Sequence, residues 1–187
     1  EAGLAELERI GASRFAGRVP IGNQRLLLHW ASGRFDRSLA YVDAIRAALP
    51  ATPPSGSDRR LADLVRLELL AELGRDQEVA DEFDEIAPHL DLDASSCIRA
   101  TGELYLTADL VGRLGRADLA PPLIARLEPF GGQLMVLGWG EAVFGAADRV
   151  LAHLRSLVAG VVDEAGLDAA LRVERAAGAT LEVARTD

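Results

Sequence analysis

The fold is decided by four short segments in which an aspartate follows a glycine: Gly33-Arg34-Phe35-Asp36, Gly74-Arg75-Asp76-Gln77, Gly115-Arg116-Ala117-Asp118 and Gly160-Val161-Val162-Asp163. Their glycines are 41, 41 and 45 residues apart. Glycine suits the left-handed backbone conformation that ends a helix, and an aspartate shortly after it can cap the next helix. Each segment therefore predicts a tight turn between two antiparallel helices.

Apolar residues recur with helical period on both sides of these turns. Between residues 58 and 73, for example, Leu61, Leu64, Val65 and Leu69 fall on one helix face. The run 131–140 is apolar and rich in glycine, and we expect an irregular connector there. The predicted helix pairs are 23–32 with 36–49, 58–73 with 76–86, 95–114 with 118–127 and 141–158 with 163–177, preceded by a helix over 2–12.

Helix hairpins at a near-constant spacing predict an all-α fold, built as an α-solenoid of about eight or nine helices. The length of 187 residues fits a single domain over 1–187. In the second pair, Phe83 and Ile86 are expected to be buried against Leu64 or Leu69. In the third pair, the adjacent prolines 121 and 122 suit the first turn of a helix, where a missing N–H costs little.

The first turn and the helix after it resemble the second half of a tetratricopeptide (TPR) repeat. The positions that carry the resemblance are Gly33, an aromatic residue at Phe35, a small residue at Ser38, apolar residues at Val42 and Ile45, and a closing Pro50. The resemblance implies TPR-like helix hairpins. The spacing here exceeds the usual 34 residues, and the later units keep only the turn and the apolar positions.

From Ala71 to the end, the chain resembles the helical region of large actinobacterial regulators that carry a STAND-class signalling ATPase. The resemblance implies a piece of a longer protein, with an adenylate-cyclase-like domain in front or a LuxR-type DNA-binding domain behind. The chain departs from the pattern at Gly160-Val161-Val162 and at Leu181-Glu182. The matching motifs are Ala-Glu-Leu-Gly-Arg-Asp (71–76) leading to Phe83, Pro129-Phe-Gly-Gly before Gly138-Trp-Gly140, and the closing Gly178-Ala179 and Ala184-Arg185-Thr186.

Composition excludes several classes of function. All 20 basic residues are arginine, and with 29 acidic residues the net charge is −9. A chain this acidic is a poor binder of nucleic-acid phosphates. Without lysine there is no P-loop lysine and no Schiff base. The sequence contains no run of 18 apolar residues, the length that would predict a membrane span. We therefore expect a cytoplasmic chain with no direct contact to nucleic acid or membrane.

No motif predicts catalysis, a metal site or a cofactor. His29, His89 and His153 are far apart and lack metal-ligand spacing, and Cys97 stands outside any nucleophile motif. The single cysteine also excludes an internal disulfide. We therefore expect no catalytic residue, no metal, no cofactor and no enzymatic activity.

The glycine-rich run 130–145 is the first candidate for binding. Gly138 and Gly140 match the start of a phosphate-binding Gly-x-Gly-x-x-Gly, but Val143 stands at its third glycine. One interpretation is a buried, extended connector whose glycines allow helices to approach closely. The other is a ligand or partner contact formed by Gly138, Trp139 and Gly140.

Arg59 and Arg66 are the second candidate, because they lie seven residues apart on one helix face. In TPR arrays the first helices line a concave groove, where arginines hold acidic groups of a peptide. The alternative is a solvated face with ion pairs to Asp63 or Glu68.

These observations predict a non-catalytic protein–protein interaction or sensor module of a multidomain signalling or transcriptional regulator. Its partner would be a protein, a peptide or another domain of the same parent protein. The alternative is a small-molecule effector-binding domain with a pocket near residues 130–145. The sequence does not define the oligomeric state.

Overall fold

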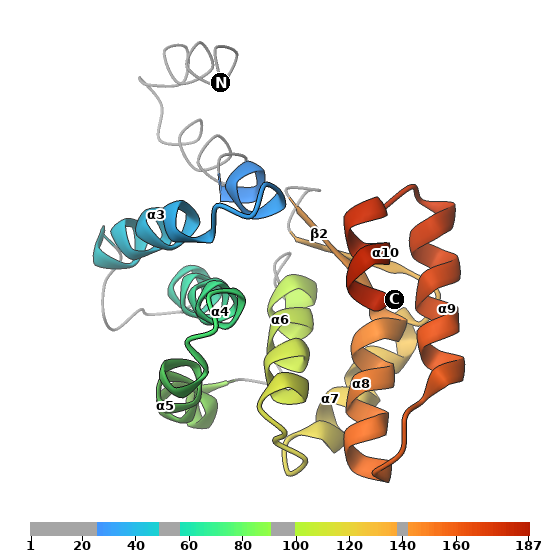
Figure 1. Ribbon diagram of the computed structural model, residues 1–187. Helices are drawn as coiled ribbons and strands as arrows, with labels where there is room; N and C mark the ends of the chain where they lie inside the picture. Colours follow the sequence, from blue (N-terminus) through green and yellow to red (C-terminus); the bar gives the residue numbers. More distant parts are fainter. Residues whose placement is uncertain (1–25, 49–56, 91–99, 138–141) are drawn as a thin grey trace.

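Helices make up most of the chain that the structure describes. A computed structural model describes residues 26–48, 57–90, 100–137 and 142–187. The prediction of an all-α fold is confirmed for these residues, with one small β-hairpin among the helices (Figure 1). The predicted helix over 2–12 lies outside them. After a helix over 26–31, the elements are α3 (Phe35–Ala48), α4 (Ser57–Glu72), α5 (Asp76–Ile86), α6 (Ala100–Arg113), α7 (Ala120–Leu127), β1 (Leu134–Leu137), β2 (Ala142–Ala146), α8 (Ala147–Ala159), α9 (Glu164–Ala176) and α10 (Thr180–Thr186), with 3₁₀ turns at Ala87–His89 and Glu128–Phe130.

The four predicted turns are present. Gly33, Gly74, Gly115 and Gly160 all have φ between 67° and 70°, the left-handed conformation that a side chain disfavours. At the fourth turn the Asp163 carboxylate also accepts a hydrogen bond from the backbone N–H of Gly166, at 3.0 Å. The glycine-plus-aspartate prediction therefore holds in full at the turn between α8 and α9.

The capping role predicted for the other three aspartates is wrong. Asp36 already lies in the first turn of α3, which begins at Phe35. Arg75 is the N-cap residue of α5, and Asp76 already lies in the first turn of the helix. Leu119 is the N-cap residue of α7, and Asp118 instead pairs with Arg116 at 3.1 Å. Neither helix receives a side-chain cap, because each aspartate is displaced by one residue from the capping position. In the first turn Asp76 still complements the helix dipole. Pro121 and Pro122 do lie in the first turn of α7, as predicted.

The first helices of successive pairs lie side by side. In Figure 1, α4, α6 and α8 follow one another across the molecule; α4 packs on α6, and α6 packs on α8. The second helices α5, α7 and α9 each pack on the first helix of their own pair. A solenoid requires this neighbour-to-neighbour packing, and the repeat organisation itself stays a prediction.

The core of the second pair is close to the expected one. Phe83, Leu64 and Leu69 are fully buried where α4 and α5 pack together. Ile86 was expected to be buried but is only half-buried. It is the last residue of α5, where the chain passes into a 3₁₀ turn at the edge of the core.

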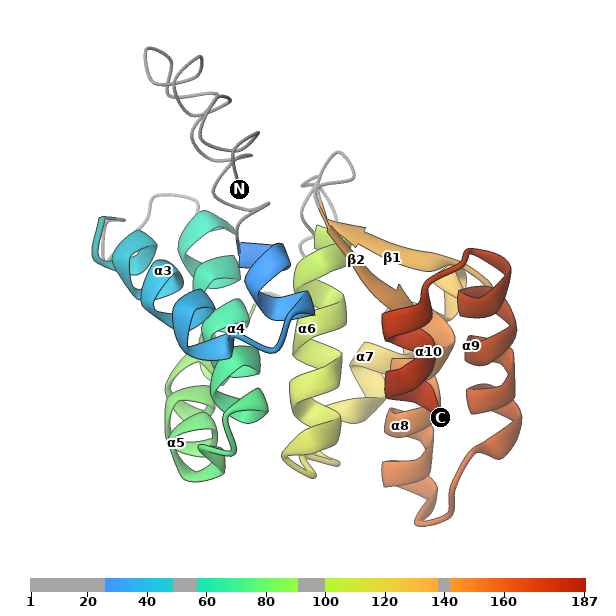
Figure 2. The same cartoon turned by 45° about the horizontal axis from the view of Figure 1, so that its top comes forward.

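The expectation of an irregular connector followed by a helix from residue 141 is wrong. β1 and β2 form an antiparallel hairpin, with a register shift between Met135 and Val136, and α8 begins only at Ala147. Burial alternates along β1, which is the period of a strand with one face on the core. Figure 2 shows the hairpin beside α6 and α9, against which β1 and β2 pack, respectively.

The last helix, α10, had no counterpart among the predicted helix pairs. Gly178, with a left-handed φ of 68°, lies in the turn between α9 and α10. This turn folds α10 back onto α9 and the β-hairpin. Figure 2 shows α10 beside α8 and α9, and from there the Arg185 side chain reaches Glu72 of α4.

Candidate functional site

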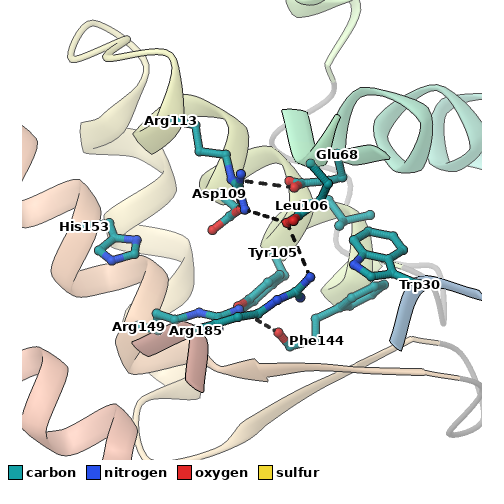
Figure 3. Close-up of a pocket in the computed structure, with 11 residues that line it drawn as sticks. Trp30, Glu68, Tyr105, Leu106, Asp109, Arg113, Phe144, Arg149, His153 and Arg185 are labelled. Carbon is teal, nitrogen blue, oxygen red and sulfur yellow. Dashed lines mark hydrogen bonds and ion pairs between the residues drawn. The ribbon is translucent and has the colours of Figure 1, made fainter. Parts of the chain in front are cut away.

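A pocket of about 370 Å³ lies where the helix over 26–31, α4, α6, β2, α8 and α10 meet (Figure 3). Its volume is within the range of small-ligand sites in proteins. Charged side chains dominate the lining, with three aromatic rings, Trp30, Tyr105 and Phe144, beside them. Elements from both ends of the described chain therefore contribute to one polar pocket.

One side of the pocket is acidic. Glu68 of α4 is only 3% exposed, and Asp109 of α6 lies near it. Arg113 joins this side from the next turn of α6: its Nε donates to Asp109 Oδ2 at 2.8 Å and lies 3.8 Å from Glu68 Oε2. Its Nη2 donates to Glu72 Oε1 at 3.1 Å. A single guanidinium thus serves three carboxylates.

The Glu68 carboxyl holds its proton to an unusually high pH. Burial raises its pKa well above the ordinary value, and the adjacent charge of Asp109 raises it further, against the opposing effect of Arg113. Glu68 Oε1 is buried and accepts no hydrogen bond from the residues that the structure describes. When Glu68 is protonated, its carboxyl can donate a hydrogen bond to Asp109, and this hydrogen bond favours the neutral form of Glu68.

The opposite side of the pocket is organised by Arg149 of α8, which is 4% exposed. Its Nη2 donates to the Phe144 carbonyl at 2.9 Å and to the Tyr105 hydroxyl, and its Cζ lies 5.7 Å from the centre of the Tyr105 ring. Nη1 forms a 3.0 Å ion pair with Glu182 Oε2, although the pair is poorly aligned for a hydrogen bond. Burial raises the pKa of both Tyr105 and Glu182, so the charged forms of these two groups are disfavoured.

Gly145 makes room for this arrangement. Its φ is 120°, and a Cβ there would lie 3.0 Å from Arg149 Nη2 and from the Tyr105 hydroxyl, and 3.1 Å from Glu174 Oε1. Glu174 is fully buried and accepts from the Ala146 N–H at 3.0 Å. The glycine in β2 therefore lets three polar side chains from different elements converge.

Trp30 and Arg185 close the remaining side. Arg185 Cζ lies 5.6 Å from the centre of the indole ring, and its Nη2 is 3.3 Å from Glu72 Oε1. Trp30 is 9% exposed, and its Nε1 has no hydrogen-bond partner among the described residues. Figure 3 shows the indole at the edge of the pocket, next to Phe144. A buried N–H donor is therefore left unused beside the pocket.

His153 of α8 also lines the pocket. Burial is the main cause of its lowered pKa, and the nearby Arg149 and Arg113 lower it further. The imidazole is therefore neutral at pH 7, and it adds no positive charge to the pocket.

Arg59 and Arg66 lie away from this pocket. Arg59 pairs with Asp63 at 3.2 Å, as one alternative had it, and donates to the Arg46 carbonyl at 2.8 Å. Arg66 donates to Asp43 at 2.7 Å and also pairs with Glu82. The structure therefore directs Arg66 toward α3 and α5, whereas Glu68, two residues on and about half a helical turn around, lines the pocket.

The predicted contacts Gly138, Trp139 and Gly140 lie outside the described residues, as does Cys97. Phe144 is the part of the predicted 130–145 region that lines the pocket. The remaining lining residues belong to helices.

Sequence reasoning missed the main pocket residues, Glu68, Asp109, Arg113, Arg149 and Arg185. Glu68 carried a usable signal, because it interrupts the run Leu67-Glu68-Leu69-Leu70, whose leucines are buried. Charged residues in such a position are rare unless they are paired. Asp109 and Arg113 are four residues apart on one helix, so their ion pair is local. Arg149 and Arg185 reach the pocket only through tertiary packing.

The described residues contain no group of three or more histidine, cysteine, aspartate or glutamate side chains that could hold a metal ion. Among these same ranges, no helix has the length and apolar character needed to cross a membrane. No protein-family model, curated protein or solved structure matches the chain at a significant level.

Proposed function

We propose that this chain is a non-catalytic sensor module that binds a small molecule in the pocket between α4, α6, α8 and α10. The observation that carries the proposal is the composition of the pocket wall. Trp30 and Arg185 come from opposite ends of the described chain and meet over one pocket, together with buried polar atoms that have no partner in the part of the chain that the structure describes. A protein gains no stability from such unsatisfied groups, which favours a role in binding.

A ligand in this pocket would be sensed by the whole array. It would contact helices of several successive pairs and the closing helix α10 at once. A ligand shifts a conformational equilibrium by the difference in its affinity for the two states. Any arrangement in which α10 leaves Trp30 would lose part of the site, so binding would favour the closed arrangement. This gives a physical route from ligand binding to a neighbouring domain.

The parent protein, in this proposal, is a cytoplasmic signalling or transcriptional regulator of the STAND ATPase class, and the chain is its TPR-like solenoid. The support for this part is the sequence resemblance of residues 71–187. The module itself touches neither nucleic acid nor membrane, and it carries no cofactor.

A second candidate is a contact with a protein or peptide partner, or with another domain of the parent. The turn after α8 favours it, because Val158, Val161 and Val162 are 53%, 69% and 62% exposed there. Replacing Val161 and Val162 with serine should weaken such a contact without changing ligand binding in the pocket.

The sensor proposal is tested with a metabolite panel and two matched variants. Thermal shift identifies ligands, and tryptophan fluorescence of a Trp139→Phe chain reports on Trp30 alone. Arg185→Met removes a guanidinium from the pocket, whereas Arg175→Met removes one from an exposed pair with Asp187. The proposal expects a ligand whose affinity changes at least tenfold, in either direction, in Arg185→Met and stays unchanged in Arg175→Met. A panel with no saturable ligand, or with ligands that ignore both variants, contradicts it.

A further inference from the structure

The charged groups around the pocket form one network. The pocket is lined by three carboxyl groups, of Glu68, Glu72 and Asp109, and three guanidiniums, of Arg113, Arg149 and Arg185. The three carboxyl groups are largely buried, so their interactions with charged groups are poorly screened by solvent. A carboxyl with only a weak cationic contact in such surroundings can bind a positively charged ligand group.

Each arginine of the network already has hydrogen-bond or ion-pair partners within the chain. Arg149 is bound by the Phe144 carbonyl, Tyr105 and Glu182, and Arg185 lies with Glu72 and Trp30. Arg113 donates to Asp109 and Glu72, and at 3.8 Å it is too far from Glu68 for a hydrogen bond. Glu68 is therefore the pocket carboxyl with the weakest cationic contact, a 3.8 Å ion pair that makes no hydrogen bond.

We infer that the pocket takes a small aliphatic ligand with a primary ammonium group, which binds between the carboxyl groups of Glu68 and Asp109. This inference rests on the proposed function and names the ligand class of that site. An ammonium group has three donors, enough for both carboxylates and one further acceptor. The aromatic rings of Trp30, Tyr105 and Phe144 provide apolar surface for the carbon chain.

The indole of Trp30 adds a second requirement. Its Nε1–H is buried and donates to none of the described residues, so the ligand gains affinity from an acceptor, such as a hydroxyl oxygen, at its other end. Glu68 and Asp109 would thus hold the ammonium end of the ligand, and the Trp30 N–H would donate to its other end. A short amino alcohol has this chemistry.

Binding of the ammonium group releases the proton of Glu68. Two ionised carboxylates are unfavourable together, but a cation between them removes the repulsion. The charged and titratable groups that face Glu68 and Asp109 belong to four helices: Glu72 on α4, Tyr105 and Arg113 on α6, Arg149 and His153 on α8, and Arg185 on α10. Asp43 of α3 and Glu82 of α5 are bound to Arg66, away from the pocket. Because one proton is released per ligand bound, the affinity rises up to about tenfold for each unit of pH. This rise applies over the pH range in which Glu68 is protonated in the free chain.

Calorimetric titration of the whole chain with matched compounds tests the inference. The probes are 4-amino-1-butanol, 1,4-butanediol and 4-hydroxybutyrate, which differ in the charge of one end, and n-butylammonium, which lacks the hydroxyl. We expect 4-amino-1-butanol to bind most tightly, n-butylammonium more weakly, and the neutral and anionic compounds at least tenfold more weakly than the amino alcohol. As the pH rises from about 4.5 toward the raised pKa of Glu68, the affinity for 4-amino-1-butanol should rise, with up to one proton released.

Two glutamate variants provide the control. Glu68→Gln mimics the protonated carboxyl and should fold, but it should lose at least tenfold in affinity for the amino alcohol, together with the pH dependence. Glu78→Gln changes an exposed carboxylate that pairs with Arg75, and should bind normally. Asp109→Asn removes the other carboxylate of the pair and should likewise lower the affinity for the amino alcohol.

Three results would overturn the inference: equal binding of the diol, unchanged affinity in Glu68→Gln, or no binding of either amine. If 4-hydroxybutyrate binds in the pocket instead, the ligand class is wrong and the sensor proposal stands. If the metabolite panel also yields no ligand, both fall.

Discussion

The guanidinium of Arg185 lies over the indole ring of Trp30, with Cζ 5.6 Å from the ring centre. The two residues are at opposite ends of the described chain, and no sequence pattern links them. Their contact places the closing helix α10 against the first described helix. The same guanidinium also reaches Glu72 of α4, so one side chain connects three elements at the rim of the pocket.

Loss of the buried arginine should destabilise the chain. Arg149 and Glu182 are 4% and 7% exposed and form an ion pair. Arg149→Met removes one partner and leaves a buried carboxyl, so we expect a loss of roughly 3 kcal/mol in the free energy of unfolding. Urea denaturation measures it. Arg175→Met, at an exposed pair, should cost under about 1 kcal/mol. Equal losses in the two variants would contradict the role given to Arg149.

Stability should depend on pH through Glu68. Its pKa in the folded chain lies above the ordinary value of 4.5, so the folded chain holds a proton that the unfolded chain has released. The free energy of unfolding therefore falls as the pH rises from about 4.5 through the folded pKa. Glu182 contributes in the same direction, because burial raises its pKa as well.

Glu68→Gln isolates the contribution of Glu68, since Glu182 is present in both chains. The variant should show a smaller fall in stability than the wild-type chain when denaturation is repeated at pH 5, 6, 7 and 8. Parallel curves for the two chains would mean that Glu68 titrates normally.

Packing of the second helix pair predicts a large effect at Phe83. Its side chain is fully buried, and Phe83→Ala should lower the free energy of unfolding by about 3–5 kcal/mol. Ile86→Ala, at the half-buried end of the same helix, should cost less. A loss under about 1 kcal/mol for Phe83→Ala would place the side chain outside the core.

We expect the purified chain to have no ATP hydrolysis or cyclase activity. The sequence lacks lysine, and catalysis of phosphoryl transfer needs several cationic or metal-bound groups around the phosphates. Release of phosphate from ATP is the measurement. Turnover that disappears when Gly138, Gly140 or Glu141 is changed would instead make the glycine-rich run an active site.

The helices and turns could be predicted from local sequence, whereas the pocket could not. Left-handed glycines such as Gly74 and periodic leucines such as Leu64 act within one helix pair, and they gave the pairs correctly. The β-hairpin was missed because two strands of four and five residues have too short an apolar pattern to distinguish them from a buried connector or helix start. Convergence of Glu68, Asp109, Arg149 and Arg185 depends on how α4, α6, α8 and α10 pack, and that information is not contained in any one segment.

NMR of the two tryptophan indole N–H groups tests whether the helical pocket is the binding site. One interpretation of the sequence was a ligand contact at Trp139, whereas the proposed pocket contains Trp30, so one spectrum compares the two sites. Trp139→Phe assigns the peaks, and 4-amino-1-butanol is the titrant. We predict a saturable shift of the Trp30 peak with the Trp139 peak unchanged. A shift of the Trp139 peak alone, or no shift of either peak, would contradict the claim.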